Sequence, residues 1–397
     1  DSNGFTLGSD DNSNQTSKNF VGWQWKAGGT APTKTYKVVV VDDSGNKYRF
    51  RNSGDTATFA QSAVTLDLQE GGTYIFDQSD SSNSGHPLRF YTASDKSGGE
   101  YTTGVTTSGT AGNAGAFTQI TVAASAPTLY YQCSSHAGMG GQVNTNTTHG
   151  QTNFDGSILS VSQANTTAGF SIVLFTGNAT AGQTVGHGLG VKPEIIFAKN
   201  RSNGNNWNCY VEATDNTGDY TLTLNGTGAR SNSFNMWNDT APTSSVITLG
   251  NRNETNGSSH NMVFYCLHSI KGYSKIGFYT GNGSSSNPPF VYLGFKPAFF
   301  LIKSIDAARN WHIIDDKRNT INPLNLYLNP NNSDADGTFE FGDFLSNGFK
   351  ITNLGNTFNT NGEKYLYYAI ASSPFVSSKG VPTTARWEMI GTFILYQ

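Results

Sequence analysis

The chain is poor in charge and in cysteine. Asp, Glu, Lys and Arg make up only 13% of its 397 residues, about half of the usual quarter. The net charge is −3 and the sequence contains no basic run, which argues against nucleic acid as a partner. The three cysteines, Cys133, Cys209 and Cys266, are too few for a disulfide framework.

The chain also lacks the patterns of membrane helices and of common enzymes. No apolar run approaches the ~20 residues that a membrane span requires, so we expect no membrane span. No stretch keeps apolar residues at i, i+3, i+4 and i+7 over the length of a helix. A phosphate-binding glycine loop, a Gly-x-Ser-x-Gly elbow and a His-Glu-x-x-His helix are all missing. We therefore expect a protein that is not an enzyme.

Short strand-like runs fill the sequence instead. Segments such as TYKVVVV, TYIF, EIIFAK and KYLYYAIA are rich in β-branched and aromatic residues, and Gly, Asn and Ser separate them at short intervals. This pattern is typical of sandwiches and barrels. The expected fold class is therefore all-β, with β-sandwich domains in tandem.

The second half of the sequence contains an internal repeat. FTGN at 175–178 recurs within FYTGN at 278–282, and GVKPEIIFAKN at 190–200 recurs as GFKPAFFLIKS at 294–304. These matches, and the pair Trp207 and Trp311, share an offset of 104 residues. ITLGNRNETNGSSHNMVFYCLHS at 247–269 also aligns with residues 351–373, with a slip of one or two residues. The sequence therefore predicts two copies of one β-sandwich module.

The repeat sets the expected domain boundaries. Residues 1–27 have the form of the end of a third copy, because Leu7-Gly8 matches Leu249-Gly250, and we expect a hairpin that packs on another domain or chain. The chain is thus expected to comprise a truncated repeat hairpin at 1–27, a first sandwich domain at 28–145, a linker at 146–167, repeat modules at 168–271 and 272–375, and a C-terminal segment at 376–397.

Few residues of the repeats suggest chemistry. Trp207 and Trp311 are either sugar-stacking platforms or core residues, and core packing is favoured. His187 has no counterpart in the second copy, and the neighbours Asp315 and Asp316 are expected in a solvated turn. Cys209 and Cys266 fall in one module and could form a disulfide, although neither recurs in the other.

The first domain carries a stronger pattern. His86 lies in NSGHPLRF, and Cys133, His136 and Met139 follow in CSSHAGM. A thiolate, two imidazoles and a weak axial thioether are the ligands of a mononuclear copper site, whereas Met is not a usual ligand of zinc. The alternative is that Cys133 and Met139 are core hydrophobes and the histidines are incidental.

These motifs resemble the cupredoxins, the family of plastocyanin and amicyanin. LDLQEGGTYIFDQ resembles the strand that enters the ligand region, GHPLRF resembles the first His ligand, and CSSHAGM resembles the closing loop. The resemblance implies a cupredoxin-like Greek-key sandwich in which His86, Cys133, His136 and Met139 are metal ligands. It implies copper as cofactor, and a vestigial site without the ion is the alternative. One loop cysteine argues against a binuclear copper centre.

A longer resemblance implies a function. The string from TYIFDQSDSSNSGHPLRF to APTLYYQCSSHAGMGG is similar to a cupredoxin-like segment of virion proteins of marine bacteriophages, cyanophages among them. Flanking stretches such as FYTGNGSSSNPPFVYLGFKPAFFLIKS and FLSNGFKI resemble phage modules as well. The resemblance implies an oligomeric tail fibre, capsid decoration or adhesin on the virion surface, which contacts other virion proteins and a host receptor or glycan. The alternatives are an electron-transfer copper protein with surface-anchoring modules and a carbohydrate-binding protein.

Overall fold

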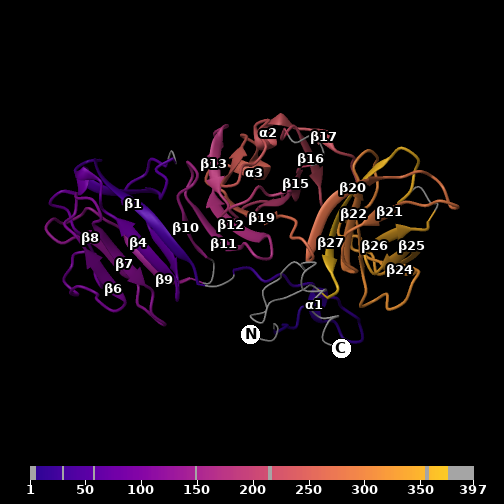
Figure 1. Ribbon diagram of the computed structural model, residues 1–397, viewed down its shortest axis with the longest axis horizontal. Helices are drawn as coiled ribbons and strands as arrows, with labels where there is room; N and C mark the ends of the chain where they lie inside the picture. Colours follow the sequence, from indigo (N-terminus) through magenta and orange to yellow (C-terminus); the bar gives the residue numbers. More distant parts are fainter. Residues whose placement is uncertain are drawn as a thin grey trace, which may run out of the picture.

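The computed structural model describes residues 6–28, 31–56, 59–147, 150–212, 217–353 and 357–373. Their regular structure is almost entirely β, in several separate sheets, which confirms the all-β, multi-sandwich fold class. Three β units follow one another along the molecule, with the first and third at opposite ends (Figure 1). Within the described part of the chain, no helix is long and apolar enough to cross a membrane.

The first unit is a sandwich of two mixed sheets. Their orders are β2-β1-β4-β7-β6 and β3-β9-β8-β5, with β1 parallel to β4 and β3 parallel to β9. Alternate residues face inward, and Tyr36, Phe50, Phe76 and Tyr131 form an aromatic core between the sheets. The elements are β1 (Thr33–Asp42), β2 (Asn46–Asn52), β3 (Leu66–Gln69), β4 (Thr73–Asp77), the 3₁₀ turn η1 (Ser81–Asn83), β5 (Leu88–Tyr91), β6 (Val105–Ser108), β7 (Phe117–Thr121), β8 (Leu129–Cys133) and β9 (Gln142–Thr147).

The second unit has one eight-stranded sheet, β10-β11-β12-β19-β14-β15-β16-β17, and a pair, β13-β18. A core that includes Val173, Trp237 and Phe264 contains residues of the large sheet, of the pair and of the short helix α2. The elements are β10 (Gln151–Asn153), β11 (Ser160–Asn165), β12 (Phe170–Thr176), β13 (Gln183–Gly186), β14 (Ile195–Asn200), β15 (Asn208–Val211), β16 (Tyr220–Thr223), β17 (Ser231–Asn232), α2 (Phe234–Trp237), β18 (Val246–Leu249), α3 (Asn253–Asn256) and β19 (Asn261–Leu267).

The third unit is a sandwich of two four-stranded sheets, β20-β27-β22-β23 and β21-β26-β25-β24. Phe300, Phe341, Phe349 and Tyr367 fill the space between them. The strands are β20 (Ser274–Thr280), β21 (Phe290–Tyr292), β22 (Pro297–Ser304), β23 (His312–Asp315), β24 (Leu324–Tyr327), β25 (Gly337–Leu345), β26 (Gly348–Ile351) and β27 (Lys364–Ala371).

The internal repeat is visible in the strand ladders. The order β12-β19-β14-β15 of the second unit recurs as β20-β27-β22-β23 in the third. Val173 pairs with Phe264 in one copy and Gly277 with Tyr367 in the other, so the first strands differ by 104 residues and the last strands by 103. A one-residue deletion before the last strand therefore explains the slip in the sequence alignment.

The repeated Thr-Gly-Asn motif has a structural role in both copies. A Cβ on Gly177 would lie 2.4 Å from the carbonyl oxygen of Gly257, so the close approach of the two loops requires glycine. Asn178 donates its backbone N–H to the side-chain oxygen of the fully buried Asn256 at 2.9 Å. Gly281, Asn282 and the fully buried Asn359 repeat this arrangement, the last two at 2.8 Å. The motif thus ties the first strand of each module to the loop before its last strand.

The expectation of a linker at 146–167 is wrong. Strand β11 pairs with β12 along its whole length and belongs to the sheet of the second unit. The preceding residues belong to the first unit as well, because Phe154 lies in its aromatic core and Tyr36 donates its hydroxyl to the carbonyl of Thr152 at 2.7 Å. The segment is polar in composition, but its few apolar residues lie in the cores of both units: Phe154 in that of the first and Ile158 in that of the second.

The N-terminal hairpin is also not observed. Residues 6–28 contain the single turn α1 (Asp11–Asn14) and no strand, and residues 1–5 lie outside the described residues. The expected packing on another domain is found, because the rings of Trp23 and Trp25 meet Phe299 of β22 edge to face, with centroids 6.0 and 5.5 Å apart. The two indole rings are thus partly buried by packing on the side chains of another unit, without strand pairing. The C-terminal segment 376–397 lies outside the described residues.

The two repeat modules share one apolar cluster. It joins Phe170, Leu267 and Cys209 of the second unit to Phe299 and Trp311 of the third. The joint also contains the buried ammonium group of Lys303, which donates to the carbonyls of Thr227 (3.1 Å), Ser304 (2.7 Å) and Ala307 (3.3 Å). Burial lowers the pKa of Lys303 to about 8. The third unit is therefore fixed on the second by apolar contacts and by the hydrogen bond from the Lys303 ammonium group to Thr227.

Candidate metal centre

The pairing of β5 with β8 brings His86 and Cys133 together. Leu88, the first residue of β5, lies opposite Cys133, the last residue of β8. His86 is two residues before Leu88, and the backbone N–H of Ser134 donates to the carbonyl of Pro87 at 3.0 Å. Two residues 47 positions apart in the sequence thus lie at the same end of the sandwich, as the motif predicts.

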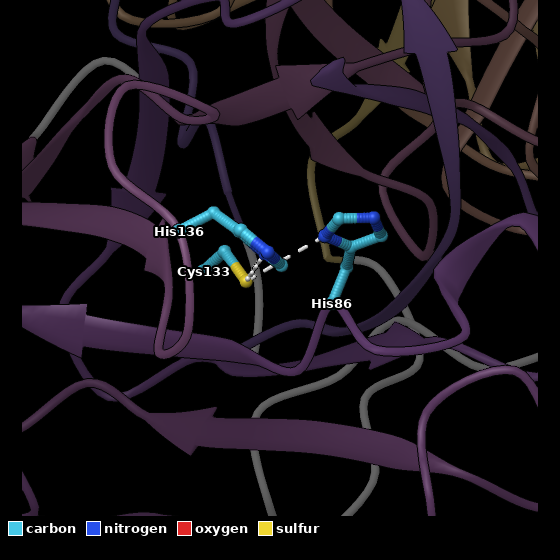
Figure 2. A group of neighbouring side chains, drawn as sticks. All are labelled: His86, Cys133 and His136. Atoms are coloured by element: carbon cyan, nitrogen blue, oxygen red, sulfur yellow. Dashed lines mark hydrogen bonds between the residues drawn. The ribbon is translucent and has the colours of Figure 1, made fainter.

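His86, Cys133 and His136 converge on one point (Figure 2). The Cys133 Sγ atom lies 3.8 Å from Nδ1 of His86 and 3.5 Å from Nδ1 of His136. The thiol is buried, His86 is partly buried and His136 is exposed, so the group has one open side. The two imidazole rings are 4.7 Å apart between centroids. Within the described residues, these three side chains form a group of His and Cys residues close enough together to hold one metal ion.

The turn that carries His86 is held by two side chains. Gln78 is 2% exposed, donates to the carbonyl of His86 at 2.9 Å and accepts from the backbone N–H of Leu88 at 3.0 Å. The hydroxyl of Tyr48 donates to the same His86 carbonyl at 2.7 Å. Tyr48 lies on β2, Gln78 directly follows β4, and both are buried, so the position of His86 is fixed by the fold before any metal binds.

The loop after Cys133 is held by lysines and glycines. Lys96 donates to the carbonyls of Cys133 (3.1 Å) and Ser134 (3.2 Å), and Lys47 donates to the carbonyl of Gly138. A Cβ on Gly140 would lie 1.6 Å from the carbonyl oxygen of Tyr131. Gly140 is therefore required by close backbone contact.

Met139 lies in the same buried core cluster as Cys133 and is 1% exposed. Its carbonyl accepts the backbone N–H of Tyr48 at 2.9 Å, which fixes the end of the loop on β2. His86, Cys133 and His136 are thus brought together, and the fourth predicted ligand, Met139, is buried in the adjoining core.

The electrostatics favour neutral imidazole at His86. Burial, and next the neighbouring His136, lower the pKa of His86 below its usual 6.5. The side-chain amide of Asn46 contacts the far nitrogen of the ring, with Nδ2 3.3 Å from Nε2. Nδ1 is therefore the nitrogen that faces the thiol. A neutral imidazole is the form that binds metals.

The spacing of the donor atoms fits a trigonal metal site. Metal–nitrogen bonds of about 2.0 Å and metal–sulfur bonds of about 2.3 Å, set 120° apart, place sulfur and nitrogen about 3.7 Å from each other. The observed separations are 3.8 and 3.5 Å. A soft thiolate with two imidazoles is also the donor set that suits copper. The residues present therefore fit the ion.

The other candidate residues are not brought to this centre. His187 is fully buried, its Nδ1 accepts the backbone N–H of Leu189 at 3.2 Å, and burial lowers its pKa to about 4. The expectation of a solvated turn is wrong for Asp315, which is 3% exposed and forms a 2.8 Å ion pair with Arg318. Both residues have structural partners that explain their positions.

Both Trp residues of the repeat directly precede equivalent strands, β15 and β23. Trp311 is fully buried, as core packing predicts, whereas Trp207 is partly exposed and stacks on Tyr265. Cys209 and Cys266 are free thiols. Their side chains belong to different apolar clusters, on opposite faces of the sheet, so they cannot form a disulfide.

Some residues of the centre were not predicted from the sequence. Gln78, Tyr48 and Lys96 act through backbone carbonyls, and such contacts leave no spacing signal in a single sequence. Gln78 is a polar residue directly after a strand, and from the sequence alone it would be expected to face solvent. In the fold it is buried.

The fold and the site define a multidomain all-β protein with a candidate mononuclear metal centre in its first unit. A family model described as a domain of unknown function, DUF7483, matches residues 143–374. The match covers more than half of the chain, which therefore belongs to this family. It includes both repeat modules and begins after the predicted ligands. Neither a curated protein nor a solved structure matches the chain.

Proposed function

We propose that the first unit binds one copper ion through His86, Cys133 and His136, with Met139 as the axial ligand. The observation that carries this proposal is the separation of Cys133 Sγ from the two Nδ1 atoms, 3.8 and 3.5 Å, which is the spacing expected of ligands around one metal ion. The cupredoxin-like arrangement of a sandwich with ligands at one end supports it. The bound ion would supply one-electron transfer.

The chain's own residues have separate tasks in this site. Cys133 is the buried anionic ligand, and His136 is the exposed ligand through which an external partner approaches. Gln78 and Tyr48 hold His86 in place, so that little rearrangement of the protein is needed when the ion binds. A prearranged ligand set of this kind favours fast electron transfer and equally suits a structural ion.

Titration of the metal-free protein with Cu(II) tests the proposal. We expect binding of one equivalent and an intense visible thiolate-to-copper absorption. Cys133→Ser should abolish the absorption, whereas Cys266→Ser, the same change at a buried thiol of the second unit, should leave it intact. Absence of the band in the wild-type protein, with the fold shown intact by circular dichroism, would overturn the proposal.

We also propose that the whole chain is a structural protein of the virion surface, in several copies, that contacts other virion proteins and a host receptor or glycan. The supporting observation is that three sandwich units are joined by shared cores, as at Phe154 and Trp311, which suits a rigid projecting array. The resemblance of the sequence to phage modules supports the setting.

Purified virions of a phage that encodes the chain provide the test. We expect the protein in the particle by mass spectrometry, and antibody against residues 31–147 should label the particle surface in micrographs. Recovery of the protein only in the soluble fraction of infected cells would contradict the assignment, and it would leave the copper titration unaffected.

A further inference from the structure

One face of the large sheet in the second unit is an apolar strip that ends in two cations. Three cross-strand rows form it: Phe170, Leu267 and Ile195; Ile172, Tyr265 and Phe197; and Leu174, Val263 and Lys199. Side chains two residues apart share a face of a strand. Arg201, two residues after Lys199 and just past the end of β14, therefore lies on the same face beyond Lys199. The opposite face packs on the core of the unit.

Two adjoining hollows lie over this strip. The inner one, of about 440 Å³, lies between the two repeat modules, where Trp25, Phe299 and Leu301 face the strip. The outer one, of about 650 Å³, continues along the strip to Lys199 and Arg201. Both are lined by Ile172, Trp207 and Tyr265, which places them end to end. Volumes of this size are typical of sites for small ligands.

The floor where the hollows meet is a row of stacked rings. Tyr265 lies parallel to Phe170 at 6.3 Å between centroids and is tilted by 23° against Trp207 at 6.0 Å. The inner hollow offers almost no polar group, so a sugar there would lose the hydrogen bonds of its hydroxyls to water. An aliphatic or aromatic body would lose nothing. The inner hollow therefore selects an apolar group.

The outer hollow selects charge. Lys199 is partly buried with its ammonium group bonded to the carbonyl of Asn205, and Arg201 is exposed. Asp67 of the first unit lies across from them, and its carboxylate accepts the side-chain N–H of Asn144 at 3.1 Å. Two cations against one carboxylate leave a net positive mouth, which favours an anionic head group.

The third unit lacks this site, although it has the same strand order. Lys303 is the counterpart of Lys199 at the repeat offset, but it is fully buried, and three carbonyls, one of them of the second unit, accept its hydrogen bonds. The cationic end of the strip is thus covered in the third unit and open in the second.

We propose that these hollows bind an anionic amphiphile, with the apolar chain in the inner hollow against Ile172 and Tyr265 and the acidic head at Lys199 and Arg201. This site is independent of the metal centre. A long-chain carboxylate has the required chemistry: one apolar body and one terminal anion.

Calorimetry with decanoate, decanol and decyltrimethylammonium tests the proposal on the whole protein, below the micelle concentration of the two ionic probes and below the solubility limit of decanol. We expect one decanoate per chain, bound about tenfold more tightly than decanol, since one charge-assisted contact is worth about one factor of ten. Decyltrimethylammonium should bind more weakly than decanol. This ranking needs no variant and is therefore free of folding effects.

Two variants locate the site. Lys199→Gln/Arg201→Gln should weaken decanoate about tenfold and leave decanol unchanged, whereas Lys271→Gln/Arg252→Gln, two exposed cations elsewhere, should change neither. Ile172→Trp fills the inner hollow and should weaken both probes. No saturable binding of decanoate, equal binding of all three probes, or displacement of decanoate by maltoheptaose would overturn the proposal.

Discussion

Trp311 donates its indole N–H to the carbonyl of Thr223 at 2.9 Å, across the joint between the two repeat modules. Its repeat counterpart Trp207 lies partly exposed on Tyr265. The same residue at the same point of the repeat thus closes the joint in one copy and lines an open hollow in the other. Position in the array, and not the module alone, determines what the side chain does.

This difference predicts unequal effects on stability. Trp311→Ala should lower the free energy of unfolding by about 3–5 kcal/mol, because it leaves a cavity in a fully buried cluster. Trp207→Ala should lower it by less than about half of that, because its ring already contacts solvent. Urea unfolding followed by circular dichroism measures both changes. Equal losses would show that the two rings are equally buried.

The two buried asparagines should be equivalent to each other. Asn256→Ala removes the acceptor of the Asn178 backbone N–H, and Asn359→Ala does the same for Asn282. Each change leaves a backbone donor without its partner and should cost about 1–3 kcal/mol. Asn19→Ala, at an exposed position, is the control and should be neutral. Thermal melting of the three variants checks the prediction, which would be contradicted by a neutral result at either buried site.

Gln78→Leu should weaken copper binding without unfolding the first unit. The change removes both hydrogen bonds that hold the turn of His86 at nearly constant side-chain volume. Loss of such support typically lowers metal affinity by about 10- to 100-fold. Competition with a chelator of known affinity measures the change, and Gln119→Leu, on the neighbouring strand β7, is the control. An unchanged affinity would mean that Tyr48 alone positions the ligand.

Acid should destabilise the third unit through His312. Burial, and next the charge of Lys303, lower the pKa of His312 from 6.5 to about 4, and an interaction with the side chain of Asn329 offsets them only in part. The unfolded chain therefore binds the extra proton. The contribution to stability is complete above pH 6.5 and is lost as the pH falls toward 4, by about 1.4 kcal/mol per pH unit.

His312→Phe checks this sign. Phe keeps the edge contacts with Tyr327 and Phe358 and introduces no titrating group. Urea unfolding at several pH values should show a shallower loss of stability between pH 6.5 and 4.5, and no loss of stability at pH 7.5. His187→Gln is the comparison in the second unit, where the ring is hydrogen-bonded and replacement should cost stability at every pH. A slope equal to that of the wild type would contradict the assignment.

The sequence predicted the features that leave a local pattern. Alternating and β-branched runs indicated strands, the constant offset indicated the repeated strand order, and the residue types at His86 and in the loop after Cys133 indicated the convergence of three of the four predicted ligands. The predictions that failed depended on contacts between distant segments. Residues 146–167 read as a polar linker because the apolar residue that matters, Phe154, stands alone between polar neighbours.

The same limit applies to the N-terminal segment and to Asp315. Trp23 and Trp25 alternate as in a strand, yet they bury their rings on Phe299 without strand pairing. Asp315 reads as a surface turn, because nothing in the local sequence shows that Arg318 closes over it. Local pattern thus identified the type of structure, and long-range packing decided which residues it buried.

Phe154 determines where the first unit can be cut from the rest of the chain without loss of a core residue. A cut anywhere before it, at the end of β9 for example, would remove a ring that contacts Tyr36, Phe50 and Phe59 in the core of the first unit. The first unit must therefore carry a short tail that reaches into the first hairpin of the second unit. Recombination between such proteins should join at loops within that hairpin, and a first unit excised for study alone should extend through Asp155.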